Sequence, residues 1–215
     1  VEVAAQLRER HLEAFAFRCD VTDPHEVREM ALSAKDAMGR IDILVNNAGT
    51  ATSNPLPRIS LREWEHIMSV NATGTFLCTQ AVYPDMLTRR WGRIVNIASF
   101  AGLDGDRYIA AYTAAKHAVV GFTKAVAAES IGTGVTVNAV CPGYVDTPLT
   151  DETIARIMHH TGKSWQDAMA SVLEKSGQKR LIRAHEVAEV VLELCCEDAK
   201  GRNGEIVVID GADTP

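Results

Sequence analysis

The sequence lacks any long apolar run and any excess of basic residues, and each absence excludes a class of protein. Its apolar stretches are far shorter than the roughly 18 residues that a membrane-spanning helix needs, and no basic-then-apolar signal segment opens the chain. The formal net charge is -6, whereas nucleic acids and anionic membranes are bound by dense basic surfaces. We therefore expect a cytoplasmic protein with no nucleic-acid partner and no membrane partner.

Cysteine pairs and metal-binding clusters are also missing. The chain has five cysteines, an odd number, without CxxC spacing. They lie within apolar stretches, as is typical of reduced thiols in a protein core. The adjacent His159 and His160 would point in different directions on a helix, so they do not form the start of a metal site. We predict reduced core thiols and no bound metal.

A glycine-rich phosphate-binding turn is absent as well. No segment matches GxGxxG, and the chain opens with a helical pattern that leads directly into an apolar segment. A dinucleotide-binding fold normally begins with a strand and that turn, so we expect the sequence to lack one strand–helix–strand unit of about 30 residues. Gly162, Lys163 and Ser164 do not replace the turn, because Ile157 stands where a phosphate loop has glycine.

What the sequence does contain is a regular alternation of short apolar segments and longer helical patterns. The expected strands are residues 14–21, 42–49, 93–99, 135–143 and 205–212. The expected helices are residues 23–38, about 61–89, 109–130 and 184–198. With 215 residues and 47% hydrophobic content, the chain fits one domain. The alternation predicts an α/β fold, with a Rossmann-like, doubly wound parallel sheet in three α/β/α layers and right-handed crossovers.

Small and polar residues follow three of these expected strands. NNAG ends the second strand, NIAS ends the third, and CPGYVDT follows the fourth. Doubly wound sheets bind their ligands outside the carboxyl ends of the strands. We therefore expect the functional site at that edge of the sheet.

Ser99, Tyr112 and Lys116 have a spacing that acid–base chemistry can use. Ser99 ends a strand, and Tyr112 and Lys116 lie one turn apart on one face of a helix. An ammonium group beside the phenol would lower its pKa from about 10 toward neutrality. Tyr108 lies two turns from Lys116, so Tyr112 is the catalytic candidate. A tyrosine packed beside a lysine stem explains the pair equally well by itself, and only the conjunction with the strand-end motifs favours catalysis.

Together these motifs resemble the short-chain dehydrogenase/reductase family, over essentially the whole chain. The resemblance implies hydride transfer between NAD or NADP and a secondary alcohol or ketone. It implies four catalytic residues: Asn71 positions a water, Ser99 holds the substrate oxygen, Tyr112 is the acid/base, and Lys116 binds the nicotinamide ribose. Besides Tyr112 and Lys116, the cofactor-binding residues that it implies are Asp20, Val21, Asn47, Ala48, Gly49, Pro142, Gly143, Val145 and Thr147.

The resemblance also gives expectations for residues 148–183, which match the region of a mobile substrate lid. Their pattern is similar to relatives that act on 3-oxoacyl or 3-hydroxyacyl compounds: hydroxybutyrate dehydrogenases, acyl thioester reductases and polyketide ketoreductases. The segment has six Lys or Arg against four Asp or Glu, which fits an anionic substrate or an ordinary solvated lid. A further set lines an acyl pocket or forms lid core: Tyr144, Leu149, Met158, Trp165 and Met169. The family resemblance further implies a homo-oligomer, a dimer or tetramer paired through helices 61–89 and 109–130.

Two questions stay open at the level of sequence. The residue that selects NAD or NADP follows the second strand of the fold, a position upstream of Val1. A catalytically silent relative that serves as a binding or assembly module is the second functional hypothesis, motivated by the absent phosphate-binding turn. Against it stands the complete set of Asn71, Ser99, Tyr112 and Lys116.

Overall fold

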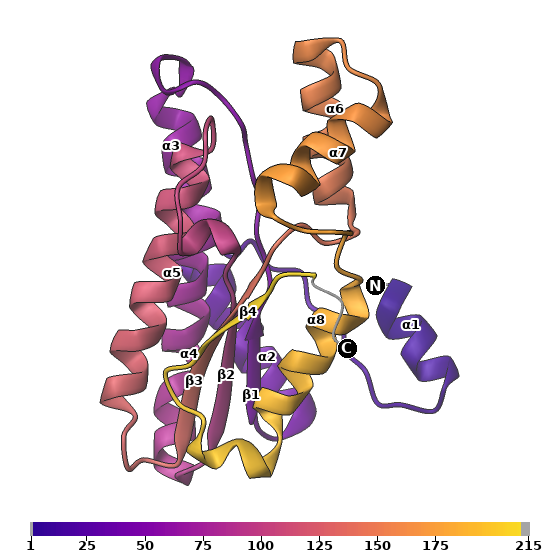
Figure 1. The fold of residues 1–215 in the computed structure, drawn as a ribbon. Helices are drawn as coiled ribbons and strands as arrows, with labels where there is room; N and C mark the ends of the chain where they lie inside the picture. Colours follow the sequence, from indigo (N-terminus) through magenta and orange to yellow (C-terminus); the bar gives the residue numbers. More distant parts are fainter. Residues whose placement is uncertain (1, 212–215) are drawn as a thin grey trace.

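A four-stranded parallel sheet forms the centre of the protein (Figure 1). We describe the protein from a computed structural model, which covers residues 2–211. The strands, in their order across the sheet, are β1 (Ile43–Asn46), β2 (Gly92–Ile97), β3 (Val135–Pro142) and β4 (Ile206–Ile209). The helices are α1 (Glu2–Glu9), α2 (Pro24–Met38), α3 (Leu61–Met68), α4 (Gly74–Arg89), α5 (Ala110–Glu129), α6 (Pro148–Thr161), α7 (Trp165–Ser176) and α8 (Ala184–Cys195).

Helices cover both faces of the sheet, which confirms the three-layer α/β prediction. On the face of α4 and α5, Ile94 and Val137 are fully buried within one apolar cluster. On the opposite face, Val95 and Val140 are buried beneath α8. Because successive residues of a strand point to opposite faces, strands buried on both sides read as nearly continuous apolar runs. That is why the sequence revealed β2 and β3, whose residues are almost all buried, whereas β1 and β4 are partly exposed.

The connection from β3 to β4 departs from the prediction that all crossovers are right-handed. The connections β1–β2 and β2–β3 pass through α4 and α5 on one face, whereas the third passes through α8 on the other. All strands are parallel and follow one another in order across the sheet. A connection on the opposite face must then have the opposite hand. This third connection is also the longest, because it carries α6 and α7, which stand beyond the edge of the sheet (Figure 1).

The strand expected at residues 14–21 is not formed. Most of this segment is extended, but no described strand pairs with it, and a strand needs the N–H and C=O groups of a neighbour. Phe15 and Phe17 are 45% and 39% exposed. Val21 packs against α4, where a Cβ atom built on Gly74 would lie 2.8 Å from its Cγ2. The apolar composition of the segment therefore did not predict its pairing.

A buried amide and hydroxyl network attaches the two long helices to the sheet. Asn46 donates from Nδ2 to Asn96 Oδ1 at 2.8 Å and to Thr79 Oγ1 at 3.0 Å. Asn96 in turn donates to Thr123 Oγ1 at 2.9 Å. Thr79 belongs to α4 and Thr123 to α5. Because buried polar groups are costly unless they are paired, this network fixes α4 and α5 relative to β1 and β2.

The prediction of reduced core thiols holds for three of the five cysteines. All five cysteines are free thiols, but Cys19 is only half-buried and Cys196 is exposed, so two of them are not core residues.

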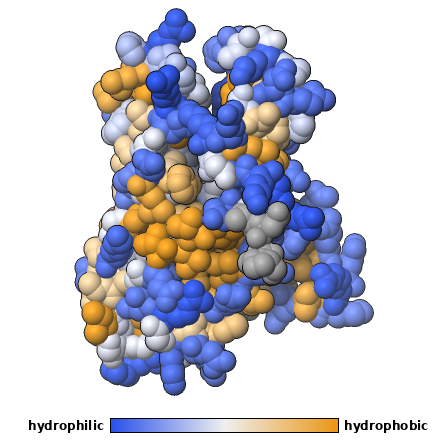
Figure 2. Space-filling view, in the orientation of Figure 1, coloured by the Kyte–Doolittle hydropathy of each residue, from blue (hydrophilic) through white to orange (hydrophobic). Residues whose placement is uncertain are grey.

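Within residues 2–211, no helix combines the length and the apolar character that crossing a membrane requires. Hydrophobic residues nevertheless reach the surface around β4 (Figure 2), where Val208 is exposed.

Candidate active site

The residues expected to be catalytic meet at the carboxyl edge of the sheet. Ser99 lies just beyond the end of β2, and Tyr112 and Lys116 lie on the first two turns of α5. A Cβ atom built on Gly49, which follows β1, would lie 3.0 Å from Asn71 Oδ1 and 3.6 Å from Lys116 Nζ. Segments from three parts of the chain therefore meet here, and the absent side chain of Gly49 leaves the space between them open. The surface is hollowed above, between α3 and α6 (Figure 2).

Asn71 sits in a π-helical turn, Ser69–Thr73, which joins α3 to α4. Its side chain is 1% exposed. Its Nδ2 donates to Thr50 O and to Ile67 O, both at 2.9 Å, while Oδ1 accepts from Thr50 N at 3.4 Å. The amide thus holds the loop that follows β1, and one lone pair of Oδ1 is left for a further donor. The helical pattern of residues 61–89 predicted the helix but not this turn.

Tyr112 hydrogen-bonds with the Ser99 side chain, which lowers its pKa, but burial of the phenol has the larger, opposite effect. The net result is a raised pKa, contrary to the expectation that Lys116 would depress it. Two features of Lys116 explain why it does not lower the pKa of Tyr112: its ammonium group is distant from the phenol ring, and it is engaged in another hydrogen bond. Lys116 Nζ lies 5.7 Å from the centre of the Tyr112 ring and donates to the Ile97 carbonyl at 2.8 Å. The phenol is therefore protonated at neutral pH and poised as an acid.

Lys116 is 5% exposed, and burial lowers its pKa from 10.5 to about 8. Between these two values the unfolded chain binds more protons than the folded protein, so stability rises with pH in that window. Relative to a Lys116→Met variant, the wild type should gain about 2 to 3 kcal/mol of unfolding free energy between pH 7 and pH 10. Urea unfolding of both proteins at the two pH values measures this. The same pH dependence in both proteins would contradict a buried, proton-binding amine.

The loop after β3 contains four of the residues expected to bind the cofactor: Pro142, Gly143, Val145 and Thr147. Gly143 N donates to Ile209 O at 2.9 Å, and Val145 O accepts from Thr147 Oγ1 at 3.3 Å and from Thr150 Oγ1 at 2.6 Å. Tyr144 is held through both its N–H and its C=O groups. The Val145 N–H has no acceptor among residues 2–211. Near a glycine that permits close approach, this loop thus offers an unpaired backbone donor to a ligand.

The remaining expected contacts fall in two groups. Asn47 and Ala48 continue the exposed turn that contains Gly49, next to Asn71 and Lys116. Asp20 and Val21 lie instead beside the start of α4. There Asp20 Oδ1 accepts from Thr22 N at 2.9 Å and from Thr22 Oγ1 at 2.8 Å. The structure brings the first group to the catalytic residues and places Val21, of the second group, against Gly74 at the start of α4.

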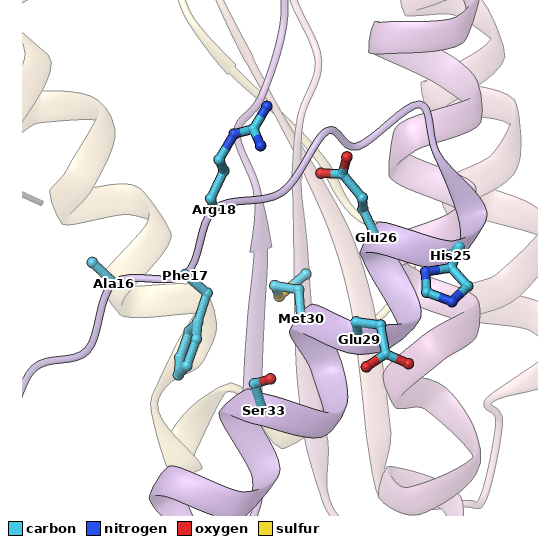
Figure 3. A pocket seen from close by; sticks show the side chains of 8 residues that line it. All are labelled: Ala16, Phe17, Arg18, His25, Glu26, Glu29, Met30 and Ser33. Carbon is cyan, nitrogen blue, oxygen red and sulfur yellow. The ribbon is translucent and has the colours of Figure 1, made fainter.

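Two open concavities lie elsewhere, along α2. One, of about 440 Å³, lies between α2 and the extended segment at Ala16–Arg18, with Glu26 and Glu29 beside it (Figure 3). The other, of about 390 Å³, lies between α2 and α4. Neither is lined by Asn71, Ser99, Tyr112 or Lys116. They do not belong to the candidate active site.

Comparison with known proteins decides the family. The sequence model described as "short chain dehydrogenase" matches residues 1–157. The chain belongs to the short-chain dehydrogenase family. It is 39% identical to D-beta-hydroxybutyrate dehydrogenase of Rhizobium meliloti over 89% of this chain and 75% of that one. It is 44% identical to 3-oxoacyl-[acyl-carrier-protein] reductase of Synechocystis over 69% of this chain and 60% of the relative.

A solved structure agrees with this assignment. A variant of actinorhodin polyketide ketoreductase, crystallised with NADPH, superposes with a TM-score of 0.91 at 35% identity, over 97% of this chain and 82% of that one. This short-chain dehydrogenase is therefore an oxidoreductase that acts on hydroxyl or keto groups with NAD or NADP. Its residues fit such a cofactor, since Gly49 leaves open space beside Asn71 and Lys116 Nζ, and the Val145 N–H has no acceptor among residues 2–211.

Proposed function

We propose that this oxidoreductase interconverts a 3-oxoacyl and a 3-hydroxyacyl compound, either a thioester or a hydroxybutyrate-like acid. The observation that carries the proposal is the hydrogen-bonded pair of Tyr112 and Ser99, with Lys116 one turn away on α5. The named relatives act on substrates of this kind: a hydroxybutyrate, a 3-oxoacyl group on a carrier protein, and a polyketide. A polyketide ketone is the alternative substrate.

The proposed roles follow from the chemistry of the side chains. Bound NADPH or NADH supplies the hydride. The Tyr112 hydroxyl gives its proton to the substrate oxygen, while the Ser99 hydroxyl donates a hydrogen bond to that oxygen. Because the pKa of Tyr112 is raised, the protonated hydroxyl is present at neutral pH and can supply the proton that ketone reduction needs. Asn71 would position a water that returns a proton from solvent.

The proposed cofactor contacts use the Val145 N–H and the donors of Lys116 Nζ that remain beside its bond to Ile97 O. Lys116 would bind the ribose hydroxyls of the nicotinamide, and the Val145 N–H would donate to the carboxamide. Asn47, Ala48 and Gly49 line the turn beneath, where no side chain of Gly49 blocks approach. Pro142, Gly143 and Thr147 would hold the ring from the other side, and Asp20 and Val21 the adenine end.

We propose further that residues 148–183 form a lid over the substrate. Ile154, Ala168, Met169 and Val172 form an apolar cluster between α6 and α7, against which Tyr144 packs. Leu149 and Trp165 are 37% and 48% exposed, so they are available to an acyl chain, whereas Met169 is core. An ion pair between Lys175 and Asp106 ties α7 to the loop before α5. Such contacts are suited to opening and closing around a ligand.

A homo-oligomer and a cytoplasmic location complete the proposal. The exposed Phe76 on α4 and the half-buried Phe122 on α5 form an edge-to-face pair, with ring centres 6.2 Å apart. An aromatic pair on adjoining long helices suits pairing of two copies across a two-fold axis, and light scattering would report the assembly size. Free thiols throughout the described residues are typical of a reducing compartment.

Fluorescence titration with NADH and NADPH, followed by an assay with acetoacetyl thioester and with acetoacetate, tests the function. We expect binding of at least one nucleotide and oxidation of it that depends on the ketone. A simple secondary ketone serves as the comparison substrate and should be used less efficiently. Nucleotide binding without any turnover would favour the silent binding module, and absence of binding would exclude the proposed reaction.

A further inference from the structure

Gln178, which follows α7, is a buried amide whose hydrogen-bonding groups are all used. It is 6% exposed. Its Oε1 accepts from Tyr144 N at 2.7 Å, and its Nε2 donates to Tyr144 O and to Arg180 O, both at 3.2 Å. The Gln178 side chain therefore hydrogen-bonds with both the N–H and the C=O of Tyr144, in the loop after β3. Buried amides with complete partners fix local geometry.

The sequence of the loop is adapted to this contact. A Cβ atom built on Gly143 would lie only 2.5 Å from Gln178 Oε1, which is closer than real Cβ contacts. Glycine at this position therefore lets Gln178 reach the Tyr144 N–H. The Gly143 backbone is itself anchored to β4, through its bond to Ile209 O at 2.9 Å.

The Gln178 contact and the backbone bonds to Ile182, among them Ile182 N to Tyr144 O at 3.0 Å, together determine which way the next N–H points. Tyr144 N donates to Gln178, and Asp146 N donates to Ile182 O at 2.8 Å, so alternate N–H groups of this stretch face residues 178–182. Val145 pairs with Ile182 as an isolated parallel bridge. Alternate groups along an extended segment point to opposite sides. The N–H of Val145 is thereby turned away from residues 178–182, and it has no acceptor in the described chain.

We propose that Gln178 is a positioning residue that orients the Val145 N–H toward the nicotinamide carboxamide, an inference that rests on the proposed function. Gln178 does not touch the cofactor. It acts through Tyr144 and couples the end of α7 to the cofactor loop. Removing it leaves the Tyr144 N–H without its acceptor and leaves the Tyr144 C=O held by the Ile182 N–H alone, at 3.0 Å, so the Val145 donor is held less firmly.

The test compares two buried side-chain amides, Gln178 and Asn138, each of which hydrogen-bonds with a backbone N–H and a backbone C=O. Asn138 is fully buried on β3, donates to Arg202 O at 2.8 Å and accepts from Glu205 N at 2.9 Å, but it lies four residues before the site on that strand. Gln178→Met and Asn138→Leu each replace an amide by an apolar side chain of similar shape. Nucleotide dissociation constants and melting temperatures are measured for the wild type and both variants.

We expect Gln178→Met to raise the nucleotide dissociation constant about tenfold, the loss of one positioned hydrogen bond, or about 1.4 kcal/mol. Asn138→Leu should lower the melting temperature comparably and leave the dissociation constant within about twofold. An unchanged constant in Gln178→Met, or an equal rise in both variants, would overturn the role of Gln178. Failure of the wild type to bind either nucleotide would overturn the proposed function as well, so the two failures are distinguishable.

Gln178→Glu provides a second reading that does not depend on the methionine variant folding. A protonated carboxyl can accept from Tyr144 N and donate to Tyr144 O, whereas a carboxylate cannot donate. Burial raises the pKa of a carboxyl group, so acidification should restore both contacts. We expect the excess in dissociation constant over the wild type to shrink between pH 8 and pH 6. A pH-independent excess would indicate that the Tyr144 contact does not govern nucleotide binding.

Discussion

Replacing Tyr112 by phenylalanine should lower kcat about 1,000-fold in ketone reduction, while the protein folds and binds nucleotide as before. The Tyr112 hydroxyl, which hydrogen-bonds with the Ser99 side chain, is the proton donor of the proposed mechanism. Positioned acid–base groups raise reaction rates by factors of about 100 to 10,000. Steady-state kinetics with a 3-oxoacyl substrate, together with a nucleotide titration, measure the two effects separately. The expected loss is in kcat, because Phe keeps the ring and its packing.

Tyr108 provides the matched control. It is 55% exposed, its backbone has a φ of 71°, and its carbonyl accepts from Asn54 N at 2.7 Å. Tyr108→Phe removes the same hydroxyl from the neighbouring turn without touching that backbone bond. Its kcat should stay within about twofold of the wild type. If Tyr112→Phe retained a tenth of the wild-type kcat, Tyr112 would not be the acid of the reaction.

Gly102→Ala should both slow the enzyme and destabilise it. Gly102 is buried in the short helical turn after Ser99, against α5. A Cβ atom there would lie 2.8 Å from Lys116 O and 3.2 Å from Val120 Cγ2. Because the nearest atom is backbone, the turn must move away from α5 and carry Ser99 with it. Overpacking of this kind costs about 1 to 3 kcal/mol, and a misplacement of about 1 Å lowers kcat about 100-fold.

Gly105→Ala is the control for a general effect of adding a methyl group to this loop. Gly105 lies three residues further along the same loop, and a Cβ atom built there has no neighbour within 4 Å. Its kinetics and its urea midpoint should match those of the wild type. If Gly102→Ala behaved in the same way as Gly105→Ala, the close packing of the Ser99 turn on α5 would not control the geometry of the site.

The sequence predicted the parts of the fold that follow from local pattern. Strands buried on both faces appear as apolar runs, so β2 and β3 were found with nearly correct limits. The spacing of Ser99, Tyr112 and Lys116 predicted their meeting, because strand end and helix periodicity fix where each side chain lies. The extended segment at 14–21 shows the limit of this reasoning. Apolar composition indicates a strand, but pairing depends on a neighbour that composition does not reveal.

Features that depend on packing across the chain could not be predicted in this way. The pKa of Tyr112 rises because the phenol is buried, and burial of one hydroxyl is not encoded in the Tyr–Lys spacing. The contact between Gln178 and Tyr144 joins residues 34 positions apart, and no motif marks the glutamine. The opposite hand of the β3–β4 connection likewise follows from which face α8 covers, a tertiary choice.

The π-helical turn at Ser69–Thr73 has a consequence for how this site tolerates insertion and deletion. A π turn arises when a helix holds one residue more than an α-helical turn accommodates. Loss of one residue there would let α3 and α4 join as a regular helix, with the hydrogen-bond ladder intact. Asn71 would nevertheless rotate by about 100° around the helix axis and leave Thr50. A length change of a single residue would thus preserve a helical backbone while it disconnected the loop after β1 from the active site.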